Sequence, residues 1–336
     1  MITFKSINKP FVVAEIGNNH EGSVINALKL IKFAKESGAD AVKFQIFNPL
    51  KYSSPKDKDR IKQLNKFVLK KKDIIRLKKE CDKLKIIFFA TPLDTDSAKF
   101  LNNIQNFFKI SSGDNNFEEL LGTVRSFKKP VIISTGLLDF LEIKKIVNYF
   151  RKFDFYKKKE NICIMHCVSA YPASNTRINL NSIPFLRKKF PNVTVGYSDH
   201  TMGSKVSCLS YALGAEIIEK HFTLSNNFSN FRDHKISLDP KAFKKFTKEI
   251  KNLKKIFGNY SKEVNIEEKK NLFAIRRKVL TNKNIKKGSK VKKKDLLIVR
   301  SKESGIYASK FKFFLGKKLI KDIKKFENFE LKHFTK

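Results

Sequence analysis

Eight apolar runs of strand length recur along the first two thirds of the chain, and they constrain the fold more than any other feature. Helix-period segments lie between several of them, most clearly over 23–39 and 141–153, where apolar residues recur every three or four positions. Eight parallel-type strands that alternate with helices predict an α/β fold, a (β/α)8 TIM barrel of about 250 residues. The predicted strands are 10–17, 40–47, 85–92, 107–113, 130–136, 161–169, 193–199 and 215–223.

A doubly wound open sheet is the alternative architecture for such a pattern. Dinucleotide-binding sheets of this kind carry a GxGxxG turn after their first strand. The first predicted strand, 10–17, is followed instead by NNHEG, so the sequence favours the barrel.

The pattern changes after residue 240. The segment 240–258 has the period of an amphipathic helix, and a polar, charged stretch follows it. Short strand signals and turn signals then begin near Ala274. We therefore expect a catalytic barrel over 1–258, a linker over 259–273 and a small β-rich domain over 274–336.

The net charge of +39 raises the alternative of a nucleic-acid-binding protein. The excess is mostly lysine spread over many segments, without recurring aromatic-basic interleaving, so we expect a solvated lysine-rich surface and no nucleic-acid partner.

The four cysteines form no CxxC pair, which indicates neither a disulfide framework nor a zinc site. No apolar run approaches the roughly 18 residues of a membrane span, and we expect a cytoplasmic protein without a membrane partner.

Polar or charged side chains lie at the C-terminal side of nearly every predicted strand. A charged group inside a core-facing strand is costly without a partner, and active sites of (β/α)8 barrels lie at the C-terminal ends of the strands. Convergence of these residues therefore predicts a site. They are Glu15, Lys43, Gln45, Lys109, Ser112, Ser134, His166, Ser169, Ser198, Asp199, His200, Glu219 and His221.

Two histidines at the ends of consecutive strands suggest a metal site. The barrel would place His200, after VGYSD, beside His221, in EIIEKHF. Neutral imidazoles suit Mn, Fe, Co or Zn, and two protein ligands leave positions open for water and a substrate carbonyl. The alternative is a pair of hydrogen-bonded structural histidines.

Two lysines stand within apolar strands, Lys43 in AVKFQIF and Lys109 in FFKISSG. A buried lysine requires an anion, which is either a bound phosphate or carboxylate ligand or a structural carboxylate such as Glu15 or Glu219. Serine hydroxyls at the same strand ends make an anion cradle the favoured interpretation.

The motifs, in their order along the chain, resemble those of the sialic acid synthases. They are AEIGNNHEG, AVKFQ, FFATP, FKISSGD, KPVIISTG, HCVSAYP, VGYSDHT and GAEIIEKHFT, followed by RDHKISLDP. The segment VLTNKNIKKGSKVKKKDLLIVRS (279–301) resembles the antifreeze-like (SAF) domain of those enzymes. The resemblance covers nearly the whole chain. It implies condensation of phosphoenolpyruvate with an N-acyl amino sugar, giving a nonulosonic acid and phosphate.

The resemblance also implies roles for individual residues. It makes His200 and His221 ligands of a divalent metal (Mn²⁺, Mg²⁺ or Co²⁺), and it implies a homodimer in which Arg300 of the swapped C-terminal domain reaches the partner's barrel. The implied catalytic residues are Glu15, Lys43, Lys109 and Glu219. The implied phosphoenolpyruvate-binding residues are Lys43, Lys109, Ser112, Ser134 and Ser198. The implied sugar-binding residues are Gln45, Asp114, Tyr171, Asp233 and Arg300.

The chain departs from the pattern of the sialic acid synthases near the expected sugar. It has Ser169 where an asparagine is common, Asp114 where a glutamate is common, and SKES after Arg300 in place of Pro-Gly. The expected acceptor is an N-acetylated amino sugar such as N-acetylmannosamine. The alternative acceptor is a 2,4-diacetamido sugar, which would make the protein a pseudaminic or legionaminic acid synthase.

Overall fold

A computed structural model describes residues 3–334 of the 336-residue chain. The chain divides into two compact units, residues 1–258 and residues 259–336. Within the described residues, no helix combines the length and the apolar composition that crossing a bilayer requires.

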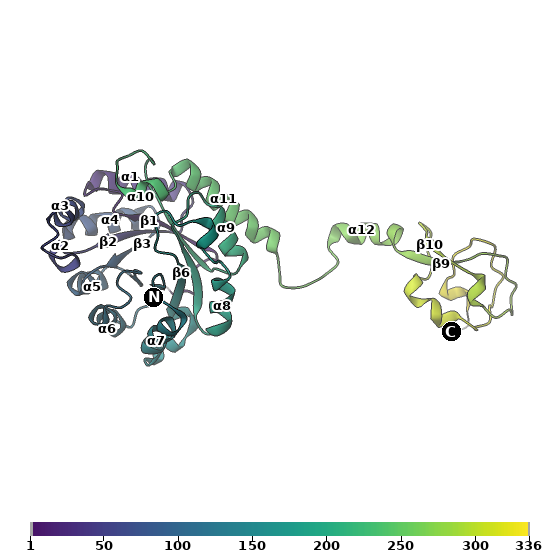
Figure 1. The fold of residues 1–336 in the computed structure, drawn as a ribbon. Coiled ribbons are helices and arrows are strands. Elements are labelled where there is room, and N and C mark those ends of the chain that lie inside the picture. Colours follow the sequence, from purple (N-terminus) through teal and green to yellow (C-terminus); the bar gives the residue numbers. More distant parts are fainter. Residues whose placement is uncertain (1–2, 335–336) are drawn as a thin grey trace. The chain divides into compact units, whose positions relative to one another are not determined.

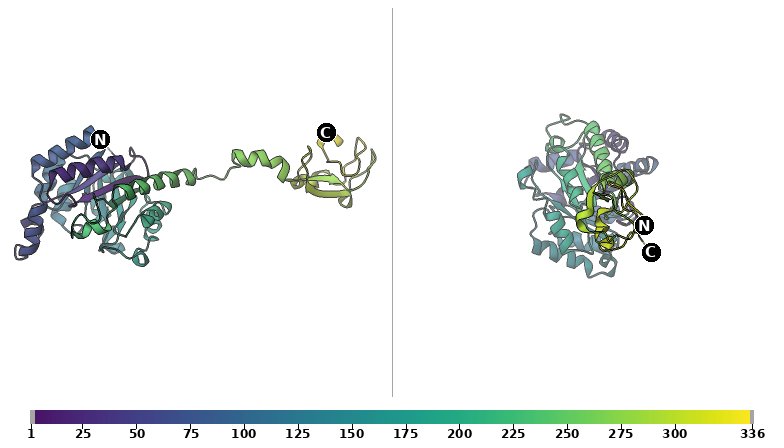
Figure 2. Two further views of the ribbon diagram at one scale, coloured as in Figure 1. Left: turned by 90° about the horizontal axis from the view of Figure 1, so that it is seen from above. Right: turned by 90° about the vertical axis from the view of Figure 1, so that its right-hand side faces the viewer.

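The first unit is the predicted barrel of eight parallel strands with helices between them (Figure 1). Figure 2 shows the same strands surrounded by helices from two further directions. Hydrogen bonds link the strands in the order β3-β2-β1-β8-β7-β6-β5-β4, so the ring is nearly closed. Each strand lies inside its predicted range: β1 Phe11–Gly17, β2 Ala41–Ile46, β3 Ile87–Pro92, β4 Phe108–Ile110, β5 Val131–Ser134, β6 Ile162–Cys167, β7 Thr194–Asp199 and β8 Ile217–His221.

The gap in the ladder lies between β3 and β4, and a side-chain amide spans part of it. The buried Gln105 accepts a hydrogen bond from the Ala90 backbone N–H at 2.8 Å and donates one to the Ala90 carbonyl at 3.3 Å. One amide group therefore takes the place of a strand partner for this residue of β3 and satisfies its backbone.

The helices of the first unit form because their apolar residues repeat at helical spacing. In α1, Ala27, Leu30, Ile31 and Ala34 form the buried stripe, and Ser23 caps the helix by accepting from the Asn26 N–H. The helices are α1 Val24–Glu36, α2 Pro49–Tyr52, α3 Lys58–Phe67, α4 Lys71–Lys83, α5 Thr95–Asn102, α6 Glu118–Ser126, α7 Phe140–Arg151, α8 Ser182–Lys189, α9 Lys205–Ala212, α10 Arg232–Ile236 and α11 Pro240–Phe257.

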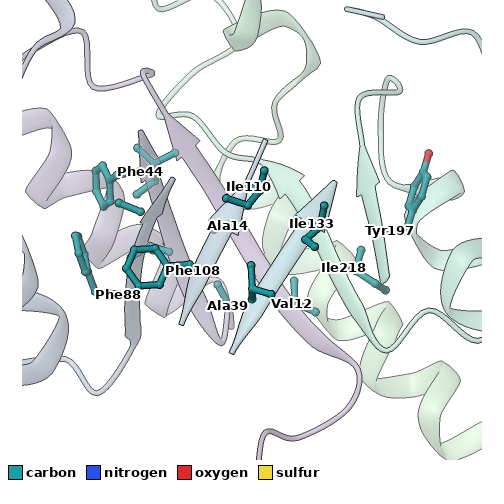
Figure 3. Packing of buried hydrophobic residues seen from close by; sticks show 14 of the residues in the cluster. Val12, Ala14, Ala39, Phe44, Phe88, Phe108, Ile110, Ile133, Tyr197 and Ile218 are labelled. Carbon is teal, nitrogen blue, oxygen red and sulfur yellow. The ribbon is translucent and has the colours of Figure 1, made fainter. Parts of the chain in front are cut away.

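Two apolar layers hold the barrel together. Outward-facing strand residues such as Val12, Phe44 and Ile218 belong to the larger layer (Figure 3). The buried faces of the helices complete this layer. A smaller cluster contains strand residues of the opposite parity, such as Phe11, Val13, Phe89 and Met165, together with Phe4 from the segment before β1. Strands buried on both faces explain the continuous apolar runs of the sequence.

The second unit contains a small antiparallel sheet, which fits the predicted β-rich module. Strand β9 (Arg277–Thr281) pairs with β10 (Leu296–Arg300), and a separate core that includes Val279, Phe314 and Phe329 packs beneath them. The segment predicted as a linker is partly helical, since α12 spans Ile266–Ile275. Asn265 and Glu268 form a capping box at its start, a signal that the charged composition of the segment obscured.

Candidate active site

The inner face of the barrel changes from apolar to charged along each strand. Residues of one parity point to the same face, so the apolar residue and the polar residue two positions later share the interior. In β1 the buried Val13 is followed by Glu15, and in β2 Ala41 is followed by Lys43. The same step leads from Phe107 to Lys109, from Ile132 to Ser134 and from Ile217 to Glu219.

These polar residues line one cavity of about 230 Å³ at the C-terminal ends of the strands. A cavity of this size and polarity suits a small metabolite rather than a macromolecule. The predicted site residues that line it are Glu15, Lys43, Gln45, Lys109, Ser112, Ser134, Ser169, Tyr171, Ser198, His200, Glu219, His221 and Asp233.

Two buried lysines and two buried glutamates form the floor of the cavity. Lys43 Nζ lies 3.2 Å from Glu15 Oε1 and 3.3 Å from Glu219 Oε1, and Lys109 Nζ lies 3.2 Å from the same Glu219 oxygen. Ser198 Oγ donates to that oxygen at 3.0 Å. The lysines therefore have the carboxylate partners that burial requires, while Oε2 of both glutamates has no partner among the described residues.

The two glutamates have opposite protonation behaviour because their surroundings differ. Burial raises the pKa of Glu15 from 4.5 to about 7, and Lys43 offsets only part of this effect. Burial acts on Glu219 in the same direction, but the Lys109 and Lys43 ammonium groups and the Ser198 hydroxyl hold its pKa far below the ordinary value. Glu219 is therefore the permanent anion of the floor, and Glu15 exchanges a proton near neutral pH.

A hydroxyl-lined hollow lies beside the lysines. A Cβ at Gly136 would lie 2.6 Å from Ser112 Oγ and 2.3 Å from Ser169 Oγ, so only glycine leaves room for both hydroxyls. The buried Oγ atoms of Ser134 and Ser169 have no partner among the described residues. Unpaired buried hydroxyls next to ammonium groups are suited to an oxyanion that accepts hydrogen bonds.

The two histidines lie side by side at the cavity wall. The ring centroids of His200 and His221 are 5.4 Å apart. His200 Nδ1 pairs with the Val168 carbonyl at 2.9 Å, which leaves Nε2 as the lone-pair nitrogen, and the buried His221 Nδ1 has no partner among the described residues. Burial lowers the pKa of His221 well below its usual value; at His200 burial is outweighed by the neighbouring Cys167 thiol, which raises the pKa.

Aromatic and charged groups form the outer wall. The ring centroids of Tyr171 and His200 are 4.2 Å apart. The guanidinium carbon of Arg232 lies over the Tyr171 ring, 4.7 Å from the ring centroid. Arg232 also pairs with Asp233 at 3.4 Å. Together these groups present a flat apolar surface with hydrogen-bonding groups at its edge, which is suited to a sugar.

Several lining residues were missed by reasoning from the sequence. Cys167 continues the inward parity of β6, and Asn18 donates to Gln45 Oε1 at 3.0 Å. Arg60 comes from α3, where its spacing from the buried Leu64 and Phe67 places it on the inward face of that helix. That spacing is the signal by which Arg60 could have been found.

Four predicted site residues do not line the cavity: Asp114, His166, Asp199 and Arg300. His166 and Asp199 have the outward parity of β6 and β7, so His166 Nε2 pairs with the Ile178 carbonyl at 2.7 Å and Asp199 pairs with Lys220. The buried Asp114 lies behind the wall and accepts a hydrogen bond from Ser111 Oγ, and Ser111 itself lines the cavity. Arg300 belongs to the second unit, where it is exposed at the end of β10 and is Cα partner to Arg277.

Comparisons with known proteins agree with this geometry. The model of the NeuB family matches residues 30–262. An N,N'-diacetyllegionaminic acid synthase from Campylobacter jejuni is 35% identical, over 96% of this chain and 99% of that protein. An N-acetylneuraminate-9-phosphate synthase from Drosophila melanogaster is 32% identical over 96% and 95%. The crystal structure of an N-acetylneuraminic acid (sialic acid) synthetase from Leptospira borgpetersenii superimposes with a TM-score of 0.74 at 33% identity, covering 79% of this chain and 90% of that one.

Proposed function

The chain belongs to the NeuB family, and we propose that it is a nonulosonic acid synthase. It condenses phosphoenolpyruvate with an N-acetylated amino sugar such as N-acetylmannosamine and releases phosphate. The observation that carries this proposal is the meeting of two buried ammonium groups, unpaired serine hydroxyls and an imidazole pair in one small cavity.

The phosphoenolpyruvate half is supported by the floor of the cavity. Lys43 and Lys109 supply the positive charge, and the hydroxyls of Ser112, Ser134 and Ser198 line the same cavity. Ser112 borders the hollow at Gly136, and the buried Ser134 hydroxyl has no partner among the described residues. Their burial makes each hydrogen bond to a phosphate or carboxylate oxygen strong, because little water competes.

The imidazole pair fits the proposed divalent metal. His200 Nε2 is left free by the bond that Nδ1 makes to the Val168 carbonyl, and neither ring nitrogen of His221 has a hydrogen-bond partner among the described residues. Within residues 3–334 no cluster of three or more His, Cys, Asp or Glu side chains has a metal-binding arrangement, so the protein would supply only these two ligands. A bound Mn²⁺, Mg²⁺ or Co²⁺ would polarise the aldehyde of the open-chain sugar and orient it.

The proposed reaction assigns a role to side chains of the cavity. C3 of phosphoenolpyruvate attacks the sugar aldehyde carbon, water adds at C2, and the C2–O bond to phosphate breaks. Glu15, with a pKa of about 7, is suited to take the proton of the incoming water. Glu219 holds Lys43, Lys109 and Ser198 in place through its Oε1 atom.

A homodimer with exchanged C-terminal domains would complete the rim of the cavity. Leu137 lines the cavity, is 77% exposed and has a φ of +68°, a strained conformation that leucine rarely adopts. An exposed apolar side chain at such a rim is suited to a protein cover. Arg300 is exposed and available for this contact. The segment that follows Arg300 is held in place by the buried Lys278, which donates hydrogen bonds to the carbonyls of Ser301 and Glu303.

A 2,4-diacetamido sugar is the second candidate acceptor. The relative from Campylobacter jejuni is named as an N,N'-diacetyllegionaminic acid synthase. In this chain Arg60 and Arg232 line the cavity and offer donors to acyl oxygens.

Phosphate release and product mass test the proposal. The protein is incubated with phosphoenolpyruvate, Mn²⁺ and either N-acetylmannosamine or a 2,4-diacetamido sugar. We expect a product whose mass equals the acceptor plus pyruvate, with stoichiometric phosphate. Release of phosphate without any C–C bonded product across the acceptor panel would contradict the proposed function.

A further inference from the structure

A second buried ion pair lies directly behind the imidazole pair. Asp199 and Lys220 immediately precede His200 and His221, and strand alternation turns them to the outer face of the barrel. Both side chains are fully buried, and Lys220 Nζ lies 3.1 Å from Asp199 Oδ2.

The Asp199 carboxylate is held from several directions. Besides Lys220, it accepts from Ser207 Oγ of α9 at 2.5 Å, from the Thr201 backbone N–H at 2.8 Å and from Tyr197 OH at 3.2 Å. A buried carboxylate with this many donors is fixed in position.

Lys220 contacts the chain on both sides of His200. It donates to Asp199 on one side and to the Thr201 carbonyl on the other, at 2.5 Å. Lys220 is itself the covalent neighbour of His221. One ammonium group therefore links the backbone segments that carry both imidazoles.

The Asp199–Lys220 ion pair lies at the point where the backbone pairing of β7 with β8 ends. The last paired residues of β7 and β8 are Asp199 and Lys220, so His200 has no ladder partner in β8. His221 is paired with Glu15 of β1 instead. His200 is held from the other side, by Ala173, whose N–H donates to the His200 carbonyl at 3.0 Å.

Stability alone gives no reason for an ion pair at this place. Replacing a buried ion pair by apolar residues of similar volume often leaves the folded state as stable or more stable, because desolvation offsets the attraction. A buried pair is better suited to fixing one geometry among several.

We propose that the Asp199–Lys220 pair is a positioning device that sets the separation of His200 and His221 for one divalent cation. The inference rests on the proposed function for the identity of that cation. The pair does not touch substrate, and it acts only through the two histidines.

The test compares two double variants of the full-length protein. Asp199→Asn with Lys220→Met removes both charges and keeps the side-chain sizes. The matched control, Lys9→Met with Glu216→Gln, removes an ion pair at the opposite end of β8. Mn²⁺ binding is measured by the electron paramagnetic resonance signal of free Mn²⁺, with His221→Ala to identify the site. The ring separation is measured in metal-free crystals.

We expect the Asp199/Lys220 variant to bind Mn²⁺ about 10- to 100-fold more weakly, as is typical when the partners of metal ligands are removed. We expect the control to bind like the wild type, and the KM for phosphoenolpyruvate to change little in either variant. Thermal unfolding is recorded for both. Unchanged Mn²⁺ affinity in a folded Asp199/Lys220 variant overturns the inference.

Two further measurements decide the remaining cases. If the double variant does not fold, Ser207→Ala removes one donor from Asp199 and keeps both charges, and unchanged Mn²⁺ binding there overturns the inference. If wild type and His221→Ala bind Mn²⁺ equally, the proposed metal site fails. The inference is then tested by the crystal structures of the metal-free wild type and Asp199/Lys220 variant. It fails if the distance between the His200 and His221 ring centroids, 5.4 Å in the wild type, differs between them by less than about 0.5 Å.

Discussion

The protonation of Glu15 gives a prediction that does not depend on the substrate. The folded chain keeps the Glu15 proton up to about pH 7, whereas an unfolded carboxyl group releases it near pH 4.5. The stability that this group contributes is therefore complete below pH 4.5 and is lost as the pH rises through 7. A tenfold change in proton affinity is worth about 1.4 kcal/mol, so the loss is about 3 kcal/mol in total.

The perturbation is Glu15→Gln, which removes the titrating group and keeps an oxygen that accepts from Gln45 and Lys43. Between pH 5 and pH 8, we expect the free energy of unfolding of the wild type to fall by about 2 to 3 kcal/mol relative to that of the variant. The chain has no tryptophan, so urea unfolding is followed by far-ultraviolet circular dichroism. Glu249→Gln, on the exposed side of α11, is the control and should follow the wild type.

The same group should control the rate. If Glu15 takes the proton of the incoming water, kcat/KM rises with pH through an apparent pKa of about 7, and Glu15→Gln removes this dependence together with most of the activity. Equal pH dependence of unfolding in wild type and variant would refute the argument that burial raises this pKa. A normal pH dependence of kcat/KM in an active Glu15→Gln enzyme would refute the catalytic role.

Three further predictions concern single positions. Arg300→Ala should raise the KM of the sugar far more than that of phosphoenolpyruvate, and equal effects in steady-state kinetics would contradict the exchanged-domain proposal. Gly136→Ala should raise the KM of phosphoenolpyruvate at least about tenfold with little change in melting temperature, because its Cβ displaces the Ser169 hydroxyl; an unchanged KM would contradict the oxyanion hollow. Gln105→Ala should lower the free energy of unfolding by about 1 to 3 kcal/mol, because the buried Ala90 N–H loses its acceptor, and urea titration would show no change if water replaces the amide.

The sequence predicts the barrel well because both faces of its strands are buried. Most positions of each run before the site are apolar, so the strands could be recognised without knowing which face was which. The lysines of β2 and β4 then stand out as charges in apolar surroundings. Parallel alignment brings the C-terminal ends of all strands together, which is why a site could be predicted from strand ends alone.

Other features depend on contacts between distant segments and could not be predicted. Both Lys43 and Lys109 pair with Glu219, whereas Glu15 pairs with Lys43 alone. This difference depends on how the ring of strands closes between β8 and its neighbours, which the sequence does not reveal. Asp114 has the position of a site residue in its motif, yet the turn after β4 directs its carboxylate to Ser111. Arg60 reaches the cavity from a helix outside the strand pattern.

Strand parity decides what each buried lysine does. The surface holds most of the charge of +39, and composition alone does not separate it from the lysines that matter. Lys43 faces the interior, where its charge is available to an anion. Lys220 stands one position away from the inward His221 and therefore faces outward, where it pairs with Asp199. A single-residue shift of β8 would exchange these faces, moving the lysine into the cavity and the imidazole into the helix layer. The register of β8 against β1 and β7 is thus the feature on which both the anion cradle and the histidine pair depend.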